Sequence, residues 1–333
     1  MANNVTGSLP GNIGAVVIGR NEGERLKICF GSLGGVAGRV VYVDSGSTDG
    51  SVRTARAMGV DALELDMHVP FTAARARNEG FRRLRVMAPD LAYVQFVDGD
   101  CEVVTGWMEK AAAWLDAYPD VAVVCGRRRE RHPRQSIYNM LCDIEWDTPV
   151  GEARACGGDA LMRVDAFEAA NGYRADLIAG EEPELCVRLR AAGWRIWRLD
   201  REMTLHDAAM TRFGQWWTRN LRSGYAYAQG VDLHGARPER YCVHESRSIW
   251  TWTLGVPLGV SGLALWWGSW ALVLLLIYPL QIVRLAARSG RSASENWWRA
   301  AFLVLGKFPE LFGQIKFLIH RHLGGKPRLI EYK

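Results

Sequence analysis

The hydrophobic and polar positions of residues 14–199 follow two alternating patterns. Short apolar runs rich in β-branched residues predict buried strands at 14–20, 39–44, 61–65, 92–97, 121–125, 156–163 and 195–199. Segments with helical spacing lie between them and predict helices at 24–33, 51–58, 71–86, 107–118, 165–170 and 181–192. This alternation predicts an α/β fold with a mostly parallel sheet and right-handed crossovers.

Two later segments depart from this alternation. Residues 127–149 are polar and basic, which predicts a long connection or a helix near the functional site. Residues 213–229 predict a polar, aromatic helix with Arg219 and Arg222 three positions apart and therefore on one face. In the predicted strand at 156–163, two glycines allow close approach of the backbone.

One predicted strand ends in two carboxylates. The run 92–97 is followed directly by Asp98, Gly99 and Asp100. In an open α/β sheet, ligands bind at the carboxyl ends of the strands. Two hard oxygen donors at that edge suit Mg²⁺ or Mn²⁺ that shares its coordination with a diphosphate. The alternative is a strand followed by an acidic turn.

The composition limits the class of protein. The 333 residues suffice for one large domain and an appendage, and the net charge of +5 is too mild to indicate nucleic acid as a partner. A mildly basic chain suits an anionic membrane surface or a nucleotide substrate. The 7 Cys residues are scattered and lack a Cys-x-x-Cys pair, which favours reduced thiols in a cytosolic setting over a zinc site or disulfides. Residues 1–10 are polar, so no signal peptide is expected.

A run of 35 residues without charge, from Ile249 to Val283, predicts insertion into a membrane. One span needs about 20 apolar residues, so the run is long for one helix and short for two. Arginines flank both ends, which predicts that both ends are cytoplasmic. We expect a hairpin of two short helices; a single span and a buried helix pair are the alternatives. Tryptophans near the probable helix ends favour the membrane: Trp250, Trp252, Trp266, Trp267 and Trp270.

Apolar residues recur at helical spacing beyond this run, from Trp298 to Ile319. They predict one or two amphipathic helices, broken near Gly306 and Pro309, that lie in the membrane interface. The alternative is an ordinary helix packed on the first domain. The expected domains are an α/β domain at 1–245, a membrane hairpin at 246–290 and interfacial helices at 291–333, on the cytoplasmic face of the cell membrane.

Five motifs resemble those of the family-2 glycosyltransferases, which have the GT-A fold. Each motif alone is a modest signal, but all five occur in the family's order over most of residues 14–230. The resemblance does not cover the last third of the chain. The motifs are 17–22 (VIGRNE), 43–50 (VDSGSTDG), 76–80 (ARNEG), 98–100 (DGD) and 180–185 (GEEPEL).

The resemblance implies roles for the matching residues. Glu182 takes the place of the catalytic base, where the family more often has Asp, and Asp98 and Asp100 take the ribose-side and metal-side positions. The expected nucleotide-binding residues are Gly19, Arg20, Asn21, Glu22, Asp44, Arg77, Asn78 and Asp98. The expected contacts of the acceptor or diphosphate are Gly158, Asp159, Glu181, Arg219 and Arg222.

His206 follows the last predicted strand of the α/β domain. Its imidazole would join Asp98 and Asp100 as a metal ligand or contact the diphosphate, with an ordinary turn histidine as the alternative. Farther on, Gln215 and Trp216 with the two arginines at 219 and 222 look like, but do not match, the Gln-x-x-Arg-Trp element of processive membrane synthases. This departure argues against a polymer-extruding synthase.

The expected function is inverting, metal-dependent transfer of a sugar from a nucleotide-diphosphate sugar to a lipid-linked or membrane-proximal saccharide acceptor, as in glycan, exopolysaccharide or glycolipid assembly. Mg²⁺ or Mn²⁺ is the expected cofactor. One alternative is a non-catalytic membrane scaffold on a degenerate transferase fold, against which the intact Asp98, Asp100 and Glu182 argue. The other is a sugar-nucleotide pyrophosphorylase, which the lack of a glycine-rich basic triphosphate loop near residue 1 disfavours.

Overall fold

The computed structural model describes residues 12–288 and 290–324, so the expectation for residues 1–10 lies outside the described part. The chain divides into two compact units. The first comprises residues up to 132, 143–177 and 181–208, and the second comprises 133–142, 178–180 and the chain from 209 onward. In this division the helix after residue 212 joins the C-terminal helices in the second unit, and the three domains expected from the sequence stay a prediction.

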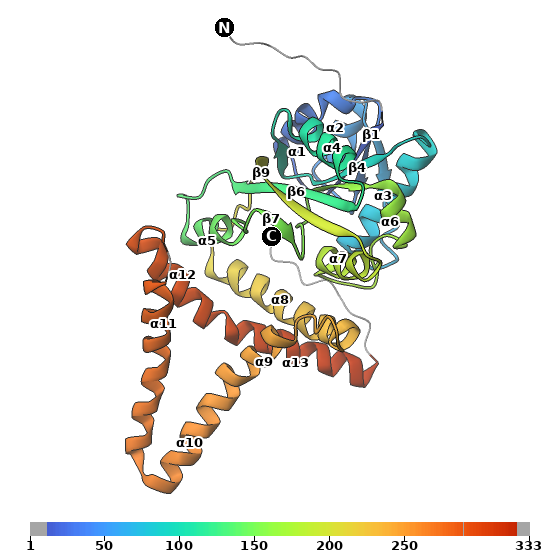
Figure 1. Cartoon of the computed structure of the whole chain (residues 1–333). Helices are drawn as coiled ribbons and strands as arrows, with labels where there is room; N and C mark the ends of the chain where they lie inside the picture. The colour runs from blue at the N-terminus through green and yellow to red at the C-terminus, as the bar shows by residue number, and fades with distance from the viewer. Residues whose placement is uncertain (1–11, 289, 325–333) are drawn as a thin grey trace. The chain divides into compact units, whose positions relative to one another are not determined.

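The described residues of the first unit form one sheet of nine strands (Figure 1). Its order is β3-β2-β1-β4-β8-β6-β9-β5, and β7 pairs with β9. The first four are parallel, as predicted, whereas β8 is antiparallel to both its neighbours and β5 and β7 are antiparallel to β9. The strands are β1 (Ile13–Gly19), β2 (Val40–Asp44), β3 (Asp61–Glu64), β4 (Tyr93–Asp98), β5 (Cys101–Val103), β6 (Val121–Glu130), β7 (Gly151–Ala153), β8 (Ala160–Arg163) and β9 (Arg195–His206).

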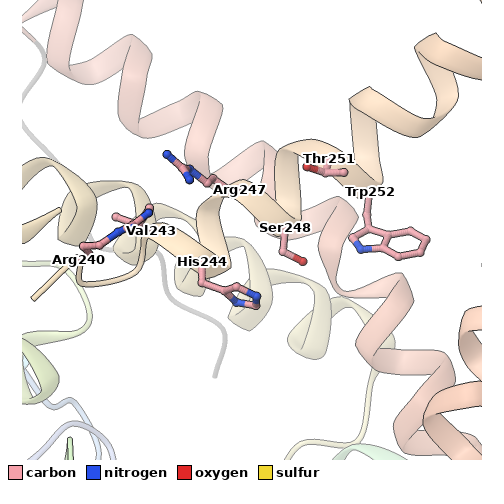
Figure 2. Close-up of a pocket in the computed structure, with 7 residues that line it drawn as sticks. All are labelled: Arg240, Val243, His244, Arg247, Ser248, Thr251 and Trp252. Carbon is pink, nitrogen blue, oxygen red and sulfur yellow. The ribbon is translucent and has the colours of Figure 1, made fainter. Parts of the chain in front are cut away.

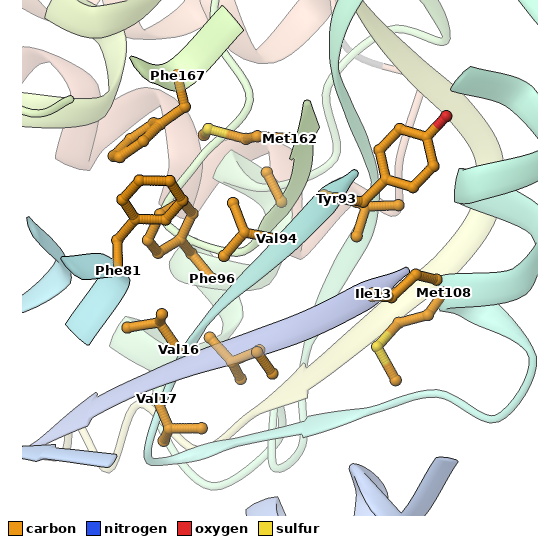
Figure 3. Packing of buried hydrophobic residues seen from close by; sticks show 14 of the residues in the cluster. Ile13, Val16, Val17, Phe81, Tyr93, Val94, Phe96, Met108, Met162 and Phe167 are labelled. Carbon is orange, nitrogen blue, oxygen red and sulfur yellow. The ribbon is translucent and has the colours of Figure 1, made fainter. Parts of the chain in front are cut away.

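Helices between the strands complete the α/β fold predicted from the sequence. They are α1 (Glu24–Ser32), the short η1 (Gly34–Val36), α2 (Ser51–Ala57), α3 (Ala73–Met87), α4 (Trp107–Ala117), α6 (Val164–Ala169) and α7 (Glu181–Ala191). A further helix, α5 (Ile137–Glu145), follows β6 and belongs mostly to the second unit. Side chains of β1, β4, α3 and α6 fill the core (Figure 3). Within it, the Phe96 ring packs against Phe167 and Tyr173 at centroid distances of 5.1 and 5.3 Å.

Gly80 sets the distance between α3 and the sheet. A Cβ at Gly80 would lie 2.4 Å from Cγ1 of Val16 and 2.8 Å from Cγ2 of Val43, so any larger residue would push the helix away. Thr72 begins the helix, since its Oγ1 accepts the N–H of Arg75 at 3.1 Å. This packing holds Arg77, one turn before Gly80, near the carboxyl ends of β1 and β4.

Two strands are longer than the sequence predicted. β6 continues through Glu130 instead of ending at Cys125, and β9 continues to His206 instead of ending at Leu199. The arginines at 127–129 therefore belong to a strand, and their interpretation as a connection or helix was wrong. Both strands are longer because β6 pairs in parallel with β9. The backbone hydrogen bonds of this pairing hold the polar residues in the strand conformation.

The second unit contains a helical hairpin. α8 (Phe213–His234) is followed by α9 (Val243–Trp250), the π-helical η2 (Thr251–Gly255) and α10 (Val256–Trp267), which run on as one helix of 25 residues. The chain reverses at Gly268, whose φ of 88° suits glycine. It returns through the 3₁₀-helical η3 (Ser269–Leu276) and α11 (Ile277–Ala287), as Figure 1 shows. Two apolar helices joined by a turn are thus present, as expected, but the first begins before the uncharged run, and their insertion into a membrane stays a prediction.

Two further helices, α12 (Ala293–Leu305) and α13 (Lys307–Leu323), match the predicted pair with a break at Gly306. α13 packs directly on the backbone of α8. A Cβ at Gly313 would lie 2.0 Å from the carbonyl oxygen of Leu221, and one at Gly224 would lie 2.0 Å from that of Glu310. One part of the predicted apolar stripe is therefore buried within this unit, while Phe312 and Ile319 remain about half exposed.

Candidate active site

Asp98, the last residue of β4, is held by two arginines. Its Oδ1 lies 2.7 Å from Nη2 of Arg77 on α3, and its Oδ2 lies 3.2 Å from Nη2 of Arg128 on β6. Burial alone would raise the pKa of Asp98, but the two guanidinium groups outweigh it and hold that pKa below its usual range. Arg77 also pairs with Glu181 of α7, Nη1 to Oε1 at 2.6 Å. Residues far apart in sequence thus meet at the end of β4.

Asp159, just before β8, connects this group to its surroundings. Its side chain is fully buried; Oδ1 accepts the backbone N–H of Asp98 at 3.1 Å, and Oδ2 accepts the hydroxyl of Thr204 at 2.9 Å. Gly158 lies directly against the arginine that pairs with Asp98, since a Cβ there would be 2.8 Å from Nη2 of Arg77. Gly158 and Asp159 therefore lie beside Asp98, and no larger residue at 158 fits without displacing Arg77; their expected contact with the acceptor or diphosphate stays a prediction.

Asp100 lies opposite His206, the last residue of β9. Oδ2 of Asp100 is 3.3 Å from Nε2 of His206, and both side chains are almost fully buried. Nδ1 of His206 is 3.7 Å from Oε2 of Glu130 and is a buried nitrogen without a hydrogen-bond partner among the described residues. Burial would raise the pKa of Glu130, but His206 and the backbone N–H groups of His132 and Ala208 lower that pKa overall.

This arrangement fits a divalent cation. Ligand atoms at about 2.1 Å from an octahedral ion lie about 3 Å apart when adjacent, which is close to the 3.3 Å between Asp100 and His206. A ligating histidine usually donates its other N–H to a carboxylate, and Glu130 lies where a small ring movement would provide that bond. The carboxylate of Asp100 suits Mg²⁺ or Mn²⁺, and the imidazole of His206 adds a ligand of a kind that transition metals take. Asp98 is a poorer candidate ligand, because both of its oxygens face arginines.

The loop after β1 adjoins the same edge of the sheet. Asn21, with φ of 56°, binds the next loop: its N–H donates to Oγ of Ser47, and its Oδ1 accepts the N–H of Thr48, both at 2.8 Å. Arg20 lies over the ring of Phe71 at 5.8 Å. The side chain of Glu22 reaches the Asp98–Asp100 turn, because its Cγ would be 3.1 Å from a Cβ at Gly99 and 2.9 Å from one at Gly19.

Two expected nucleotide-binding residues have structural partners. Asp44 is buried; its Oδ1 accepts the hydroxyl of Tyr42, and its Oδ2 accepts the N–H groups of Gly46 and Ser47. It therefore shapes the loop after β2. Both polar side-chain atoms of Asn78 bind the backbone of Tyr173. Nδ2 of Asn78 donates to the carbonyl oxygen of Tyr173 at 2.7 Å, and Oδ1 of Asn78 accepts the N–H of Tyr173 at 2.9 Å. Asn78 therefore braces Tyr173, and its expected contact with the nucleotide stays a prediction.

Glu182 lies in the first turn of α7 and is 5% exposed. Its Oε1 accepts the backbone N–H of Cys156 at 2.5 Å and the thiols of Cys156 and Cys186 at 2.9 and 3.1 Å. Within the described residues, Oε2 accepts no hydrogen bond. The adjacent carboxylates are neutralised, Glu181 by Arg77 and Glu184 by Arg188. One oxygen of Glu182 is therefore fixed, and the other is left for a substrate.

Sequence reasoning missed three residues of the site: Arg128, Glu130 and Trp146. The Arg128 guanidinium lies 4.9 Å from the centre of the Trp146 ring, and the edge of that ring meets His206 at 4.8 Å. Arg128 and Glu130 would have been found if residues 127–130 had been predicted as a strand. Side chains two positions apart in a strand point to the same face of the sheet. Arg219 and Arg222 belong to α8 in the second unit, and their expected contacts remain predictions.

About half of the chain is similar in sequence to known proteins. The family model described as glycosyl transferase family 2 matches residues 15–169. The succinoglycan biosynthesis protein ExoA of Rhizobium meliloti (strain 1021) is 30% identical over 179 residues, a match that covers 51% of this chain and 54% of ExoA. The match thus spans about half the length of that curated relative.

Solved structures share the fold at low identity. The mannosyltransferase PcManGT from Pyrobaculum calidifontis, in complex with GDP-Man and Mn²⁺, has a TM-score of 0.57 at 18% identity, covering 92% of this chain and 87% of its own. S. aureus TarS 1-349 in complex with UDP-GlcNAc has a TM-score of 0.50 at 15% identity, covering 89% and 91%. The solved structures share the GT-A fold of glycosyltransferases, and residues 15–169 of this chain are similar to glycosyl transferase family 2.

Proposed function

We propose that this protein transfers a sugar, with inversion, from a nucleoside-diphosphate sugar to a lipid-linked acceptor at a membrane. The observation that carries the proposal is the pairing of Asp100 with His206 beside the arginine-bound Asp98, at the carboxyl end of β4. Two of the structural neighbours are complexes with GDP-Man and with UDP-GlcNAc, which supports the donor class. ExoA, a succinoglycan biosynthesis protein, supports an acceptor used in polysaccharide assembly.

The reaction needs a base and charge neutralisation. In the proposed mechanism, the second oxygen of Glu182 takes the proton of the acceptor hydroxyl, whose oxygen attacks the anomeric carbon as the bond to the diphosphate breaks. A single displacement of this kind inverts the anomeric configuration. Asp100 and His206 would hold Mn²⁺ or Mg²⁺, which supplies positive charge for the leaving diphosphate. Asp98, fixed by Arg77 and Arg128, orients the donor.

Binding of nucleoside diphosphates tests the donor site. We expect at least one of UDP, GDP, ADP, CDP and dTDP to bind the full chain at least about 10-fold more tightly with Mn²⁺ than with a chelator, because a metal ion held by Asp100 and His206 would supply positive charge to the diphosphate. Isothermal titration calorimetry in detergent measures both affinities. A scaffold on a degenerate fold would bind none of the five, and binding unaffected by the chelator would contradict the metal site.

The hairpin supports membrane insertion. Its two helices, Val243–Trp267 and Ser269–Ala287, are long and apolar enough to cross a membrane. Residues 249–267 rise about 28 Å at 1.5 Å per residue, close to the thickness of the hydrocarbon layer. The 3₁₀ turns of η3 lengthen the shorter return helix, since they rise about 2.0 Å per residue. The side chains are largely exposed, for example Leu265 at 91% and Trp270 at 84%, which is costly in water.

A basic pocket at the start of the hairpin supports a lipid phosphate in the acceptor. The cavity has a volume of about 510 Å³ and lies along α9 and η2 (Figure 2). Arg240, His244 and Arg247 line it with Trp252, and among the described residues none of the three basic side chains has a carboxylate partner. Arginines next to an apolar helix attract anionic lipid headgroups. Tyr278 closes the hairpin beside the pocket, since its hydroxyl donates to the carbonyl of Trp252.

Protease protection tests the hairpin. With both flanking segments on the cytoplasmic side, a tag fused after the last residue and the α/β domain should both resist protease added to sealed right-side-out vesicles, and both should be degraded in inverted vesicles. Immunoblots for the tag and for the α/β domain report the result. Loss of the tag alone in right-side-out vesicles would show a single span and contradict the hairpin.

A further inference from the structure

Cys156, Glu182 and Cys186 converge in the first unit. The two Sγ atoms are 3.7 Å apart, and they lie 2.9 and 3.1 Å from Oε1 of Glu182. All three side chains are buried. The thiols are 30 residues apart in sequence, one in the loop before β8 and the other one turn after Glu182 on α7. The absence of a Cys-x-x-Cys pair therefore does not exclude a thiol-based metal site in this fold.

The distances match those around a tetrahedral zinc ion. Two sulfur ligands at about 2.3 Å from zinc are about 3.8 Å apart, against the 3.7 Å between the Cys156 and Cys186 sulfurs. A carboxylate oxygen at about 2.0 Å from the same ion would be about 3.5 Å from each sulfur, so Oε1 of Glu182 must move by only about 0.5 Å. Three protein ligands leave a fourth position for water.

Without a bound metal ion, the two thiols of this cluster are protonated and neutral. Burial raises the pKa of the Cys156 thiol well above its usual range, and Cys186 and Glu182 raise that pKa further. Both thiols therefore donate to the Glu182 carboxylate near neutral pH. A metal ion must displace the two protons, and a soft, thiophilic ion does so more readily than Mg²⁺ or Mn²⁺.

We propose that Cys156, Cys186 and Glu182 form a binding site for Zn²⁺ or a similar thiophilic divalent ion, separate from the Asp100–His206 pair. Binding replaces two thiol protons, which leave to solvent, by two sulfur–metal bonds and one carboxylate–metal bond. A metal ion on Oε1 withdraws electron density from the carboxylate, so Oε2 is a weaker base toward the acceptor hydroxyl. Zinc is therefore an inhibitor of sugar transfer. This consequence rests on the proposed role of Glu182 as the base, whereas the binding of zinc does not depend on that role.

Cobalt reports the site directly, because Co²⁺ bound by thiolates gives a near-ultraviolet charge-transfer band. We expect the reduced full chain in detergent to develop this band with one Co²⁺, and Zn²⁺ to remove it by competition. The zinc affinity should rise by up to about 100-fold per pH unit, because two protons are released. Cys156→Ala and Cys186→Ala should each weaken zinc binding at least about 100-fold, since each removes a thiolate ligand.

Two variants separate this site from the other candidate metal groups. Cys101 lies with Asp100 and His206 and with Asp98 and Asp159, so Cys101→Ala and Asp100→Asn should both leave the cobalt band intact. Circular dichroism and the thermal unfolding midpoint identify a variant that fails to fold, and Cys→Ser replacements then serve in its place. No band in the wild type, or a band that survives loss of both Cys156 and Cys186, overturns the proposal.

Discussion

Replacement of Asp100 by Asn is expected to abolish sugar transfer and the metal-dependent part of nucleoside-diphosphate binding. The amide keeps the shape of the side chain but removes the negative charge that faces Nε2 of His206 at 3.3 Å. Charge stabilisation by a metal contributes several kcal/mol to a transition state, so turnover should fall by at least about 1000-fold. Initial rates at saturating donor, with Mn²⁺ varied, measure the loss.

Asp90→Asn provides the matched control. Asp90 is an exposed residue just before β4. Its replacement by Asn removes the same charge at a position outside the site. It should keep wild-type rates, and both variants should keep the wild-type circular dichroism spectrum. Full activity of Asp100→Asn in metal-free buffer would disprove the metal role of this carboxylate.

Replacement of Glu182 by Gln is expected to leave donor binding within about 3-fold of wild type and to lower transfer at least about 100-fold, the usual contribution of a positioned general base. The amide oxygen of Gln still accepts the N–H of Cys156, so the start of α7 should keep its structure. Calorimetry of nucleoside-diphosphate binding and single-turnover rates separate the two effects.

Glu184→Gln shows what disturbing the same helix does. Glu184 is also buried in the first turn of α7 but is paired with Arg188, so this variant should lose stability while its folded fraction transfers sugar. Unchanged turnover in Glu182→Gln would move the base to Glu181 or Glu184. Loss of donor binding would instead make Glu182 a structural residue.

The sequence predicted the elements that bring Asp98 and Asp100 to the sheet edge, because each is defined by a strong local pattern. The run 92–97 is apolar and ends in Asp-Gly-Asp, and it forms β4, which ends at Asp98. The helix expected at 71–86 forms at Ala73–Met87 and carries Arg77 to the same edge. The break expected near Gly306 separates α12 from α13.

The missed parts depend on contacts that local pattern does not record. β6 continues through three arginines because it pairs with β9 along this stretch. Arg128 and Glu130 therefore lie in a strand, although their polar side chains predict a connection. The cluster of Cys156, Glu182 and Cys186 arises only when α7 packs beside the loop before β8. The long first hairpin helix includes charged residues such as Arg247, which a search for an uncharged run leaves out.

Transfer of radiolabel tests the central claim most directly. The full chain in detergent with Mn²⁺ would be given one labelled nucleotide sugar at a time, together with a lipid extract from the source organism. We expect one donor to label a lipid-extractable product, and we expect Glu182→Gln and a chelator each to remove that label. If the wild type labels no product above the level of Glu182→Gln with any donor while it binds a nucleoside diphosphate, the protein is not the transferase proposed here.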